Sequence, residues 1–230
     1  MHKYKFLLWD VDGTLIDFDE SERISLSNCF SSFRVSLSSD NIKKYSEINK
    51  GYWQMLEKGE ITKPELLLAR FRDFCDYLKV SHIDPAEINA MFQIELGKNC
   101  VLNDDAYKLC SDLKSQFKQY VVTNGTAVAQ YGKLKITGLI DVMDDIFISE
   151  EIGFEKPNIN FFNSVFCKIP NFQKEHALII GDSLTSDMQG GNYSGIDCCL
   201  YDPKEMHLEH SLNIKYKIKN LQELRSILDR

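Results

Sequence analysis

Six short apolar runs recur along the chain, and segments of helix length separate them. The runs span residues 4–10, 120–125, 145–149, 176–182, 197–202 and, more weakly, 214–219. Strands with few polar interruptions that alternate with helices are typical of a parallel sheet covered by helices on both faces. The sequence therefore predicts an α/β fold built on a doubly wound, Rossmann-like parallel sheet.

Between residues 16 and 97 the strand pattern is missing, and helical signals take its place. Two capping-box patterns mark the starts of helices there: Asp19 with Glu22, and Thr62 with Glu65. The chain is thus predicted to consist of an α/β core, residues 1–15 and 98–230, with an all-helical insertion, residues 16–97, directly after the first strand.

Composition and charge exclude several classes of function. The formal net charge of -7 and the lack of a basic run argue against binding to a nucleic acid polymer and favour a small-molecule ligand. The seven cysteines include no C-x-x-C pair, so a zinc ribbon is not indicated. Five histidines form no metal-like cluster and are predicted to lie on the surface or in loops: His2, His82, His176, His207 and His210.

The first apolar run, which Asp10 ends, is too short for a signal peptide or a membrane span. We therefore expect a cytoplasmic protein without a membrane partner. The sequence shows no sign of a protein partner.

Polar side chains follow the predicted strands at the points where these end. They are Asp10 and Asp12 after the first strand, Thr123 and Asn124 at the end of the second, Lys156 in the loop after the third, and Asp182 at the end of the fourth. Ligands bind beyond the carboxyl ends of the strands in an open parallel sheet, so we expect these groups to line one site. Residues two apart on a strand share a face, which predicts that Asp10 and Asp12 lie side by side.

Two carboxylates at such a short distance repel each other unless a cation lies nearby. A hard cation such as Mg²⁺ on Asp10 and Asp182, together with the ammonium of Lys156, would offset this charge. It would also let a carboxylate attack a phosphoryl group. The sequence therefore indicates phosphoryl transfer through a covalent aspartyl phosphate.

The other polar groups fit the same chemistry. The hydroxyl of Thr123 and the backbone N–H groups of Asn124 and Gly125 would hold phosphoryl oxygens. Asp12 would protonate the leaving alkoxide and later deprotonate water.

Four motifs occur in a characteristic order: DVDGTL, TNG, EKP and GDSLTSD. Together they resemble the motifs of the haloacid dehalogenase superfamily of phosphatases, over the whole chain. The resemblance implies these roles: Asp10 the nucleophile, Asp12 the general acid and base, Thr123 and Lys156 phosphate binders, and Asp182 a Mg²⁺ ligand. It further implies that the backbone carbonyl of Asp12 binds the metal, that Asp187 is an acid behind the metal ligands, and that the helical insertion is a mobile cap.

Longer segments carry a narrower resemblance. Residues 48–71, 123–139, 144–158 and 179–197 are similar to the YjjG-like pyrimidine 5′-nucleotidases, which dephosphorylate nucleoside monophosphates. This implies a Mg²⁺-dependent hydrolase whose substrate is a pyrimidine nucleoside monophosphate.

Three residues of the predicted cap have two interpretations. Asn49 and Trp53 are four apart and share a helix face, and Arg70 is polar amid apolar neighbours. Trp53 offers a flat face for stacking a base, while Asn49 and Arg70 offer donors for a base edge or ribose. In the alternative interpretation all three only stabilise the cap.

Other functions stay open at this point. A phosphoglycolate or sugar-phosphate phosphatase, or a phosphomutase such as β-phosphoglucomutase, would share all the core residues. A haloacid dehalogenase has no alkoxide to protonate, so Asp12 argues against it. A non-catalytic binding protein that keeps the fold would have lost at least one catalytic group, and none is missing.

Overall fold

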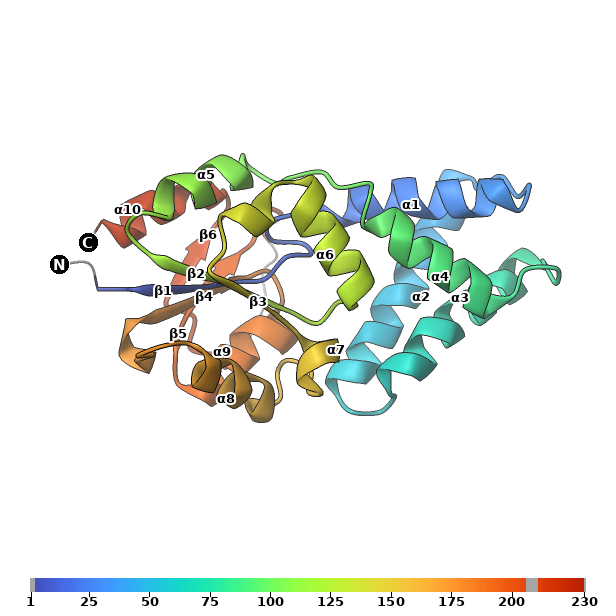
Figure 1. The fold of residues 1–230 in the computed structure, drawn as a ribbon. Coiled ribbons are helices and arrows are strands. Elements are labelled where there is room, and N and C mark those ends of the chain that lie inside the picture. Colours follow the sequence, from blue (N-terminus) through green and yellow to red (C-terminus); the bar gives the residue numbers. More distant parts are fainter. Residues whose placement is uncertain (1–2, 206–210, 230) are drawn as a thin grey trace.

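The computed structural model describes residues 3–205 and 211–229. It consists of an α/β unit and a block of helices that lies beyond the carboxyl ends of the strands (Figure 1). The α/β unit carries both ends of the described chain. Of the predicted surface histidines, His82 is exposed and His176 is half-buried. His2, His207 and His210 lie outside the described residues.

Six parallel strands form a single sheet in the order β3-β2-β1-β4-β5-β6. They are β1 (Phe6–Trp9), β2 (Lys118–Thr123), β3 (Asp145–Ile148), β4 (Ala177–Gly181), β5 (Asp197–Tyr201) and β6 (Tyr216–Ile218). β1 lies between β2 and β4, and Phe6 is in register with Lys118 on one side and Ala177 on the other. The strand order reverses at this point, so the predicted doubly wound parallel sheet is confirmed.

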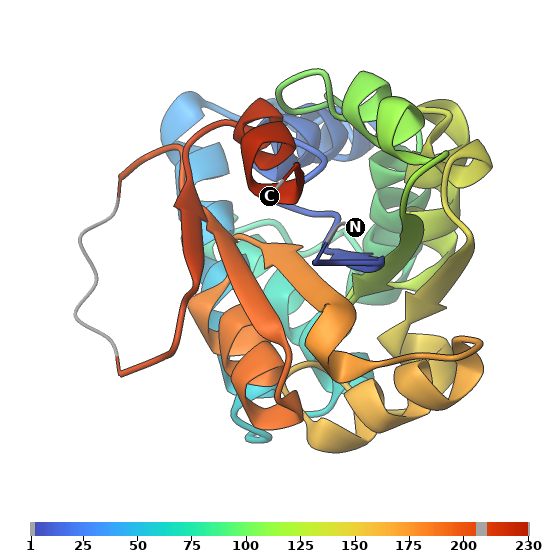
Figure 2. The same ribbon diagram turned by 90° about the vertical axis from the view of Figure 1, so that its left-hand side faces the viewer.

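Helices cover both faces of the sheet (Figure 2). They are α5 (Ala106–Leu113), α6 (Ala127–Ile136), α7 (Ser149–Ile152), α8 (Ile159–Lys168), α9 (Gln189–Ser194) and α10 (Leu224–Leu228). Alternate residues of β1 face opposite ways: Leu7 and Trp9 pack with α5, α6 and α10, whereas Leu8 packs with α8. Two apolar layers therefore hold the sheet and leave the carboxyl ends of its strands for polar groups.

The helical block follows β1 and has its own apolar core. It contains α1 (Phe18–Ser32), α2 (Ser39–Glu57), α3 (Lys63–Leu78) and α4 (Pro85–Leu96). Aromatic rings fill its centre, and Tyr45 packs edge-on against Phe74 with ring centroids 5.2 Å apart. The capping box of Thr62 and Glu65 is present at the start of α3, as predicted.

The predicted capping box of Asp19 and Glu22 is wrong. Asp17 caps α1 instead, and its carboxylate accepts from the backbone N–H of Glu20 at 3.1 Å. Glu22 is buried, and its carboxylate accepts hydrogen bonds from Ser46 and Asn49 of α2. A tertiary partner thus takes the carboxylate that a local pattern assigns to the helix end.

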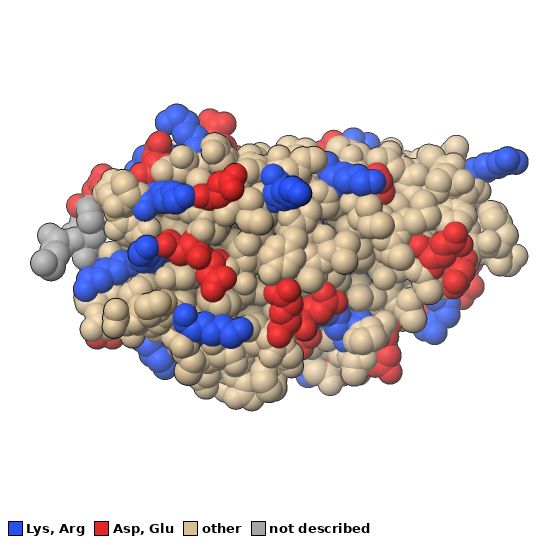
Figure 3. Space-filling view, in the orientation of Figure 1, with Lys and Arg blue, Asp and Glu red and all other residues tan. Residues whose placement is uncertain are grey.

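The block and the α/β unit meet closely where α4 ends. A side chain at Gly132 of α6 would lie 2.7 Å from the Cα atom of Gly97, so only glycine fits there. Acidic and basic side chains are interspersed on the face shown in Figure 3. In the part of the chain that the structure describes, no helix has the length and apolar composition needed to cross a bilayer.

Candidate active site

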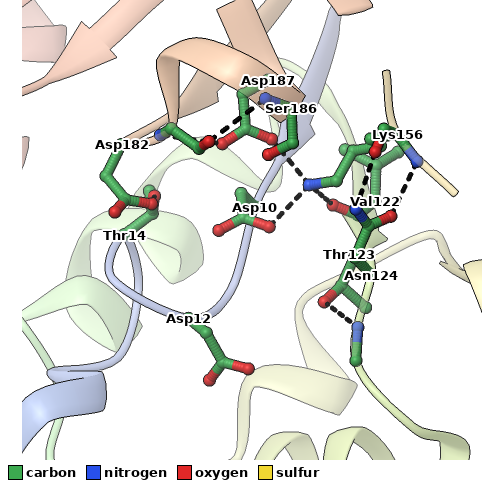
Figure 4. Close-up of polar contacts among 12 residues, drawn as sticks. Asp10, Asp12, Thr14, Val122, Thr123, Asn124, Lys156, Asp182, Ser186 and Asp187 are labelled. Atoms are coloured by element: carbon green, nitrogen blue, oxygen red, sulfur yellow. Dashed lines mark hydrogen bonds and ion pairs between the residues drawn. The ribbon is translucent and has the colours of Figure 1, made fainter. Parts of the chain in front are cut away.

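The carboxyl ends of β1, β2 and β4 bring most of the predicted site residues together at the edge of the sheet that faces the helical block (Figures 1 and 4). Asp10 follows β1, Thr123 ends β2, and Asp182 follows β4. Lys156 reaches the same place from the loop after α7.

Lys156 connects two of the carboxylates. Its ammonium donates to Asp10 at 2.7 Å, to Asp187 at 2.6 Å and to the backbone oxygen of Val122 at 2.8 Å. Burial alone would lower the pKa of Lys156, but the two carboxylates raise it above its usual range. Lys156 is therefore a fixed, buried cation at the centre of the site.

Asn124 fixes the position of Lys156. Its side-chain nitrogen donates to the backbone oxygen of Lys156 at 2.9 Å, and its side-chain oxygen accepts from the backbone N–H of Lys156 at 2.7 Å. Both polar atoms of the Asn124 amide thus hold Lys156, which leaves the backbone N–H groups of Asn124 and Gly125 for the predicted role in phosphate binding. Thr123 lies beside it, buried, and its hydroxyl accepts from the N–H of Gly125 at 3.3 Å.

Asp182 lies against the loop that follows Asp10. Thr14 donates to Asp182 at 3.2 Å, and a side chain at Gly13 would lie 2.4 Å from a carboxylate oxygen of Asp182. Gly13 also has a φ of +87°, so both its conformation and its contact with Asp182 require glycine. The DGT segment therefore shapes the space around this carboxylate.

Three carboxylates converge on one point. Asp10, Asp182 and Asp187 each offer an oxygen, and these oxygens lie within 4.8 Å of one another. Burial raises the pKa of Asp10 well above its usual range although Lys156 opposes the rise, and burial with the nearby Asp187 raises the pKa of Asp182 to about 7. Lys156 supplies one positive charge against three acids, so this oxygen-only cluster fits a hard divalent cation such as Mg²⁺.

Asp12 does not lie beside Asp10 as predicted. Its carboxylate turns away from the cluster (Figure 4) and accepts from Lys133 at 2.5 Å and from Gln130 at 2.8 Å. The prediction assumed strand geometry, but β1 ends at Trp9 and the chain has already turned at Asp12. The two carboxylates therefore serve different parts of the site.

A cavity of about 170 Å³ adjoins Asp12 and Thr123, between the α/β unit and the helical block. Phe18, Trp53 and Arg70 of the block line it, as does Lys133 of α6. A group attached to a phosphoryl group bound at Thr123 would enter this cavity.

Arg70 belongs to a buried polar network in the block. It donates to Asn49 at 2.9 Å and to Asn89 at 2.9 Å, and Asn49 in turn donates to Glu22 at 2.7 Å. The Nε atom of Arg70 is buried without a hydrogen-bond partner among the described residues. The structure thus brings Trp53 and Arg70 to the cavity. Asn49 does not line it, and its amide instead bonds to Arg70 and Glu22.

No pattern in the sequence marks Gln130 and Lys133 as site residues. Both are buried on one face of α6, three residues apart. They lie three residues apart in the helix after the TNG motif, a spacing that occurs in any amphipathic helix and does not by itself indicate a site. The contact with Asp12, more than a hundred residues earlier, could not be inferred from the sequence.

Comparison with known proteins agrees with this fold. The family model for haloacid dehalogenase-like hydrolases matches residues 7–201. The chain therefore belongs to the haloacid dehalogenase-like hydrolase family, and the resemblance to this superfamily is confirmed.

Similar proteins within the family cover the whole chain. YfnB of Bacillus subtilis, named as a HAD-hydrolase, is 38% identical over 100% of this chain and 97% of its own length. Pyrimidine 5′-nucleotidase PynA of Streptococcus pneumoniae is 33% identical over 99% and 96%, and pyrimidine 5′-nucleotidase YjjG of Escherichia coli is 27% identical over 98% of each chain.

A solved structure supports the same relationship. The crystal structure of YfnB bound to magnesium superposes with a TM-score of 0.92, at 37% identity, and covers 99% of this chain and 100% of YfnB. That structure is described as revealing an interdomain movement in YfnB.

Proposed function

We propose that this protein is a Mg²⁺-dependent phosphomonoester hydrolase that forms a covalent phosphate on Asp10, and that its substrate is a pyrimidine nucleoside monophosphate. The observation that supports this most strongly is the buried ammonium of Lys156 between Asp10 and Asp187, next to Asp182. A nucleophilic carboxylate needs such a fixed positive charge to approach an anionic phosphoryl group.

In the first step a carboxylate oxygen of Asp10 attacks phosphorus. The bond between phosphorus and the ester oxygen breaks, and its electron pair stays on the leaving oxygen. Asp12, which lines the adjoining cavity, gives a proton to this oxygen and releases it as an alcohol. Thr123 holds the phosphoryl oxygens during the transfer, and the ammonium of Lys156, whose three N–H groups donate within the protein, offsets their negative charge.

In the second step a water molecule attacks the phosphorus of the aspartyl phosphate. Asp12 takes a proton from this water, the bond between phosphorus and Asp10 breaks, and inorganic phosphate leaves. Asp10 returns to its carboxylate form and Asp12 to its protonated form.

Asp10, Asp182 and the backbone carbonyl of Asp12 would hold Mg²⁺, with Asp187 behind them. When bound, this ion supplies positive charge that lowers the repulsion between Asp10 and the phosphoryl group.

The nucleotide part of the proposal has two supports. PynA and YjjG, which match nearly the whole chain, are named as pyrimidine 5′-nucleotidases. In addition, the cavity next to Asp12 combines an indole ring at Trp53 with the buried guanidinium of Arg70. An aromatic face and a charged donor are suited to a nucleobase and its polar edge. The helical block, residues 16–97, would act as the cap that encloses the nucleoside.

The test compares kcat/KM for dUMP, dTMP, dAMP, β-glucose 1-phosphate and 2-phosphoglycolate in Mg²⁺. We expect a pyrimidine nucleotide to be the best substrate. Trp53→Ala should lower kcat/KM for dUMP by about tenfold or more but leave p-nitrophenyl phosphate nearly unchanged. If phosphoglycolate or the sugar phosphate exceeds every nucleotide by more than about tenfold, roughly 1.4 kcal/mol, the nucleotidase assignment is wrong and the phosphatase assignment stands.

A further inference from the structure

We infer that Lys133 and Gln130 of α6 form a positioning pair for Asp12. They hold its carboxylate at the wall of the cavity, where the leaving oxygen of a bound phosphate ester would lie. This inference rests on the proposed phosphatase function and adds two residues to it.

The pair contacts both oxygens of the carboxylate. The ammonium of Lys133 donates to Oδ1 of Asp12 at 2.5 Å, and the amide nitrogen of Gln130 donates to Oδ2 at 2.8 Å. Two separate donors, one on each oxygen, fix the rotation of a carboxylate as well as its position. A proton carrier needs this kind of control because proton transfer depends on distance and direction.

The helix that carries the pair is itself well anchored. Thr126 caps α6, and its hydroxyl also donates to Gln93 of the helical block at 2.7 Å. Leu134, next to Lys133, is buried in the apolar layer on one face of the sheet. Lys133 and Gln130 lie three residues apart on this fixed helix, so both side chains reach Asp12 from the same side.

The burial of Lys133 is costly and calls for a reason. Only 1% of its side chain is exposed, whereas 25% of Asp12 is exposed. In the described part of the chain, Asp12 is the carboxylate that pairs with Lys133, and the ring of Phe18 lies 5.2 Å from the ammonium. A buried ion pair often contributes little net stability, which makes stability alone a weak explanation for it.

The loop around Asp12 does not depend on this pair for its shape. Backbone hydrogen bonds from Gly13 to Ile16, at 2.9 Å, and from Ile16 to Val11, at 2.9 Å, already close the turn. The pair therefore determines where the Asp12 carboxylate points.

Gln130 gives an independent indication that the pair faces a ligand. It is 1% exposed and lines the cavity, and its Oε1 atom has no hydrogen-bond partner among residues 3–205 and 211–229. A buried polar atom without a partner is uncommon in a folded protein. This unpaired oxygen belongs to a side chain in the wall of the cavity, next to the place where the leaving group would lie.

The test compares two substrates of nearly the same shape. Phenyl phosphate and p-nitrophenyl phosphate differ mainly in how much their leaving oxygens need a proton, since p-nitrophenolate leaves readily without one. The variants are Lys133→Met, Gln130→Met and Asp12→Asn. Lys135→Met serves as the matched control because Lys135 is on the same helix and exposed. Thermal unfolding of each variant in Mg²⁺ tests whether it is folded at the assay temperature.

We expect Lys133→Met to lower kcat/KM for phenyl phosphate by about ten- to a hundredfold, and for p-nitrophenyl phosphate by only a fewfold. Gln130→Met should show the same selectivity with a smaller loss, and Lys133→Arg should recover part of it. In the Asp12→Asn background, Lys133→Met should cause little further loss, because both changes remove one function. Lys135→Met should match the wild type with both substrates.

Equal losses on the two substrates, or full additivity with Asp12→Asn, would overturn the inference while leaving the phosphatase proposal intact. If Lys133→Met is unfolded, Gln130→Met decides by the same comparison. A wild-type protein that releases phosphate from neither ester in Mg²⁺ contradicts the proposed function, and the inference with it.

Discussion

The ammonium of Lys156 lies 2.7 Å from Asp10 and 2.6 Å from Asp187, so one buried cation serves two buried carboxylates. All three side chains are almost fully buried. The arrangement leaves the cluster with an excess of negative charge once Asp182 is included. It therefore connects the stability of the protein with the cation and phosphoryl binding that we propose for this cluster.

Replacing Lys156 should affect both properties. Lys156→Met leaves Asp10 and Asp187 buried without their positive partner, which we expect to lower the free energy of unfolding by about 3–5 kcal/mol in EDTA. Turnover should fall on the order of 10²-fold or more. Urea unfolding measures the first effect. Lys43→Met, at an exposed site on α2, should stay within about 0.5 kcal/mol of the wild type, and an equally small change in Lys156→Met would contradict the account.

Gly13 and Gly153 provide a matched pair. Their φ angles are +87° and +85°, so alanine at either position strains the backbone and should lower stability by about 1 kcal/mol. A Cβ atom at Gly13 would also meet Asp182 at 2.4 Å, whereas nothing lies within 4 Å of one at Gly153. We expect only Gly13→Ala to lose phosphatase activity. Similar activity in the two variants would mean that the Gly13 contact does not shape the site.

Acid should weaken a cluster at the opposite end of the sheet. Burial favours the protonated form of Asp197, but hydrogen bonds from Lys215, Lys3 and Tyr4 outweigh this effect and lower its pKa to about 2. Since the folded-state pKa lies below the ordinary value of about 3.9, this stabilisation is complete above pH 4–5 and is lost as the pH falls toward 2.

Asp197→Asn should therefore cost about 1–2 kcal/mol at pH 7 and progressively less below pH 4. Denaturant unfolding across this pH range measures the difference. Asp76→Asn, an exposed control, should show little change at any pH. A cost for Asp197→Asn that does not depend on pH would rule out the ionic origin of this stabilisation.

Metal should stabilise the folded protein through the acidic cluster. Under the proposal, excess Mg²⁺ should raise the free energy of unfolding of the wild type by up to about 2.7 kcal/mol at a hundred times the dissociation constant, and the melting temperature should rise with it. Asp182→Asn should abolish most of this increase, and Asp197→Asn should retain it. EDTA should remove activity, and added Mg²⁺ should restore it. An EDTA-insensitive activity would exclude the proposed cofactor.

The sequence predicted the sheet well because buried parallel strands are strongly apolar and end at polar residues. Asp10, Thr123, Lys156 and Asp182 converge as expected, because the carboxyl ends of adjacent strands share an edge. These positions follow from topology, which short-range patterns largely determine.

Contacts between distant segments could not be predicted in the same way. The sequence predicts Asp12 beside Asp10, but β1 ends at Trp9 and the carboxylate of Asp12 pairs with Lys133. The sequence predicts that Glu22 caps a helix end, but its carboxylate accepts a hydrogen bond from Asn49 of another helix in the block. In each case a charged side chain bonds to a residue from a distant segment of the chain, and this contact outweighs the conformation that the local sequence favours.

Trapping the phosphorylated protein tests the central proposal most directly. In Asp12→Asn the second step should be slowed, because no base takes the proton from water, so the aspartyl phosphate should accumulate. The variant is incubated with Mg²⁺ and p-nitrophenyl phosphate, quenched in acid, reduced with borohydride and mapped by mass spectrometry. We predict modification at Asp10, and none when Asp10→Asn is added. Modification at another residue, or none in a preparation that still releases p-nitrophenol, would contradict the account.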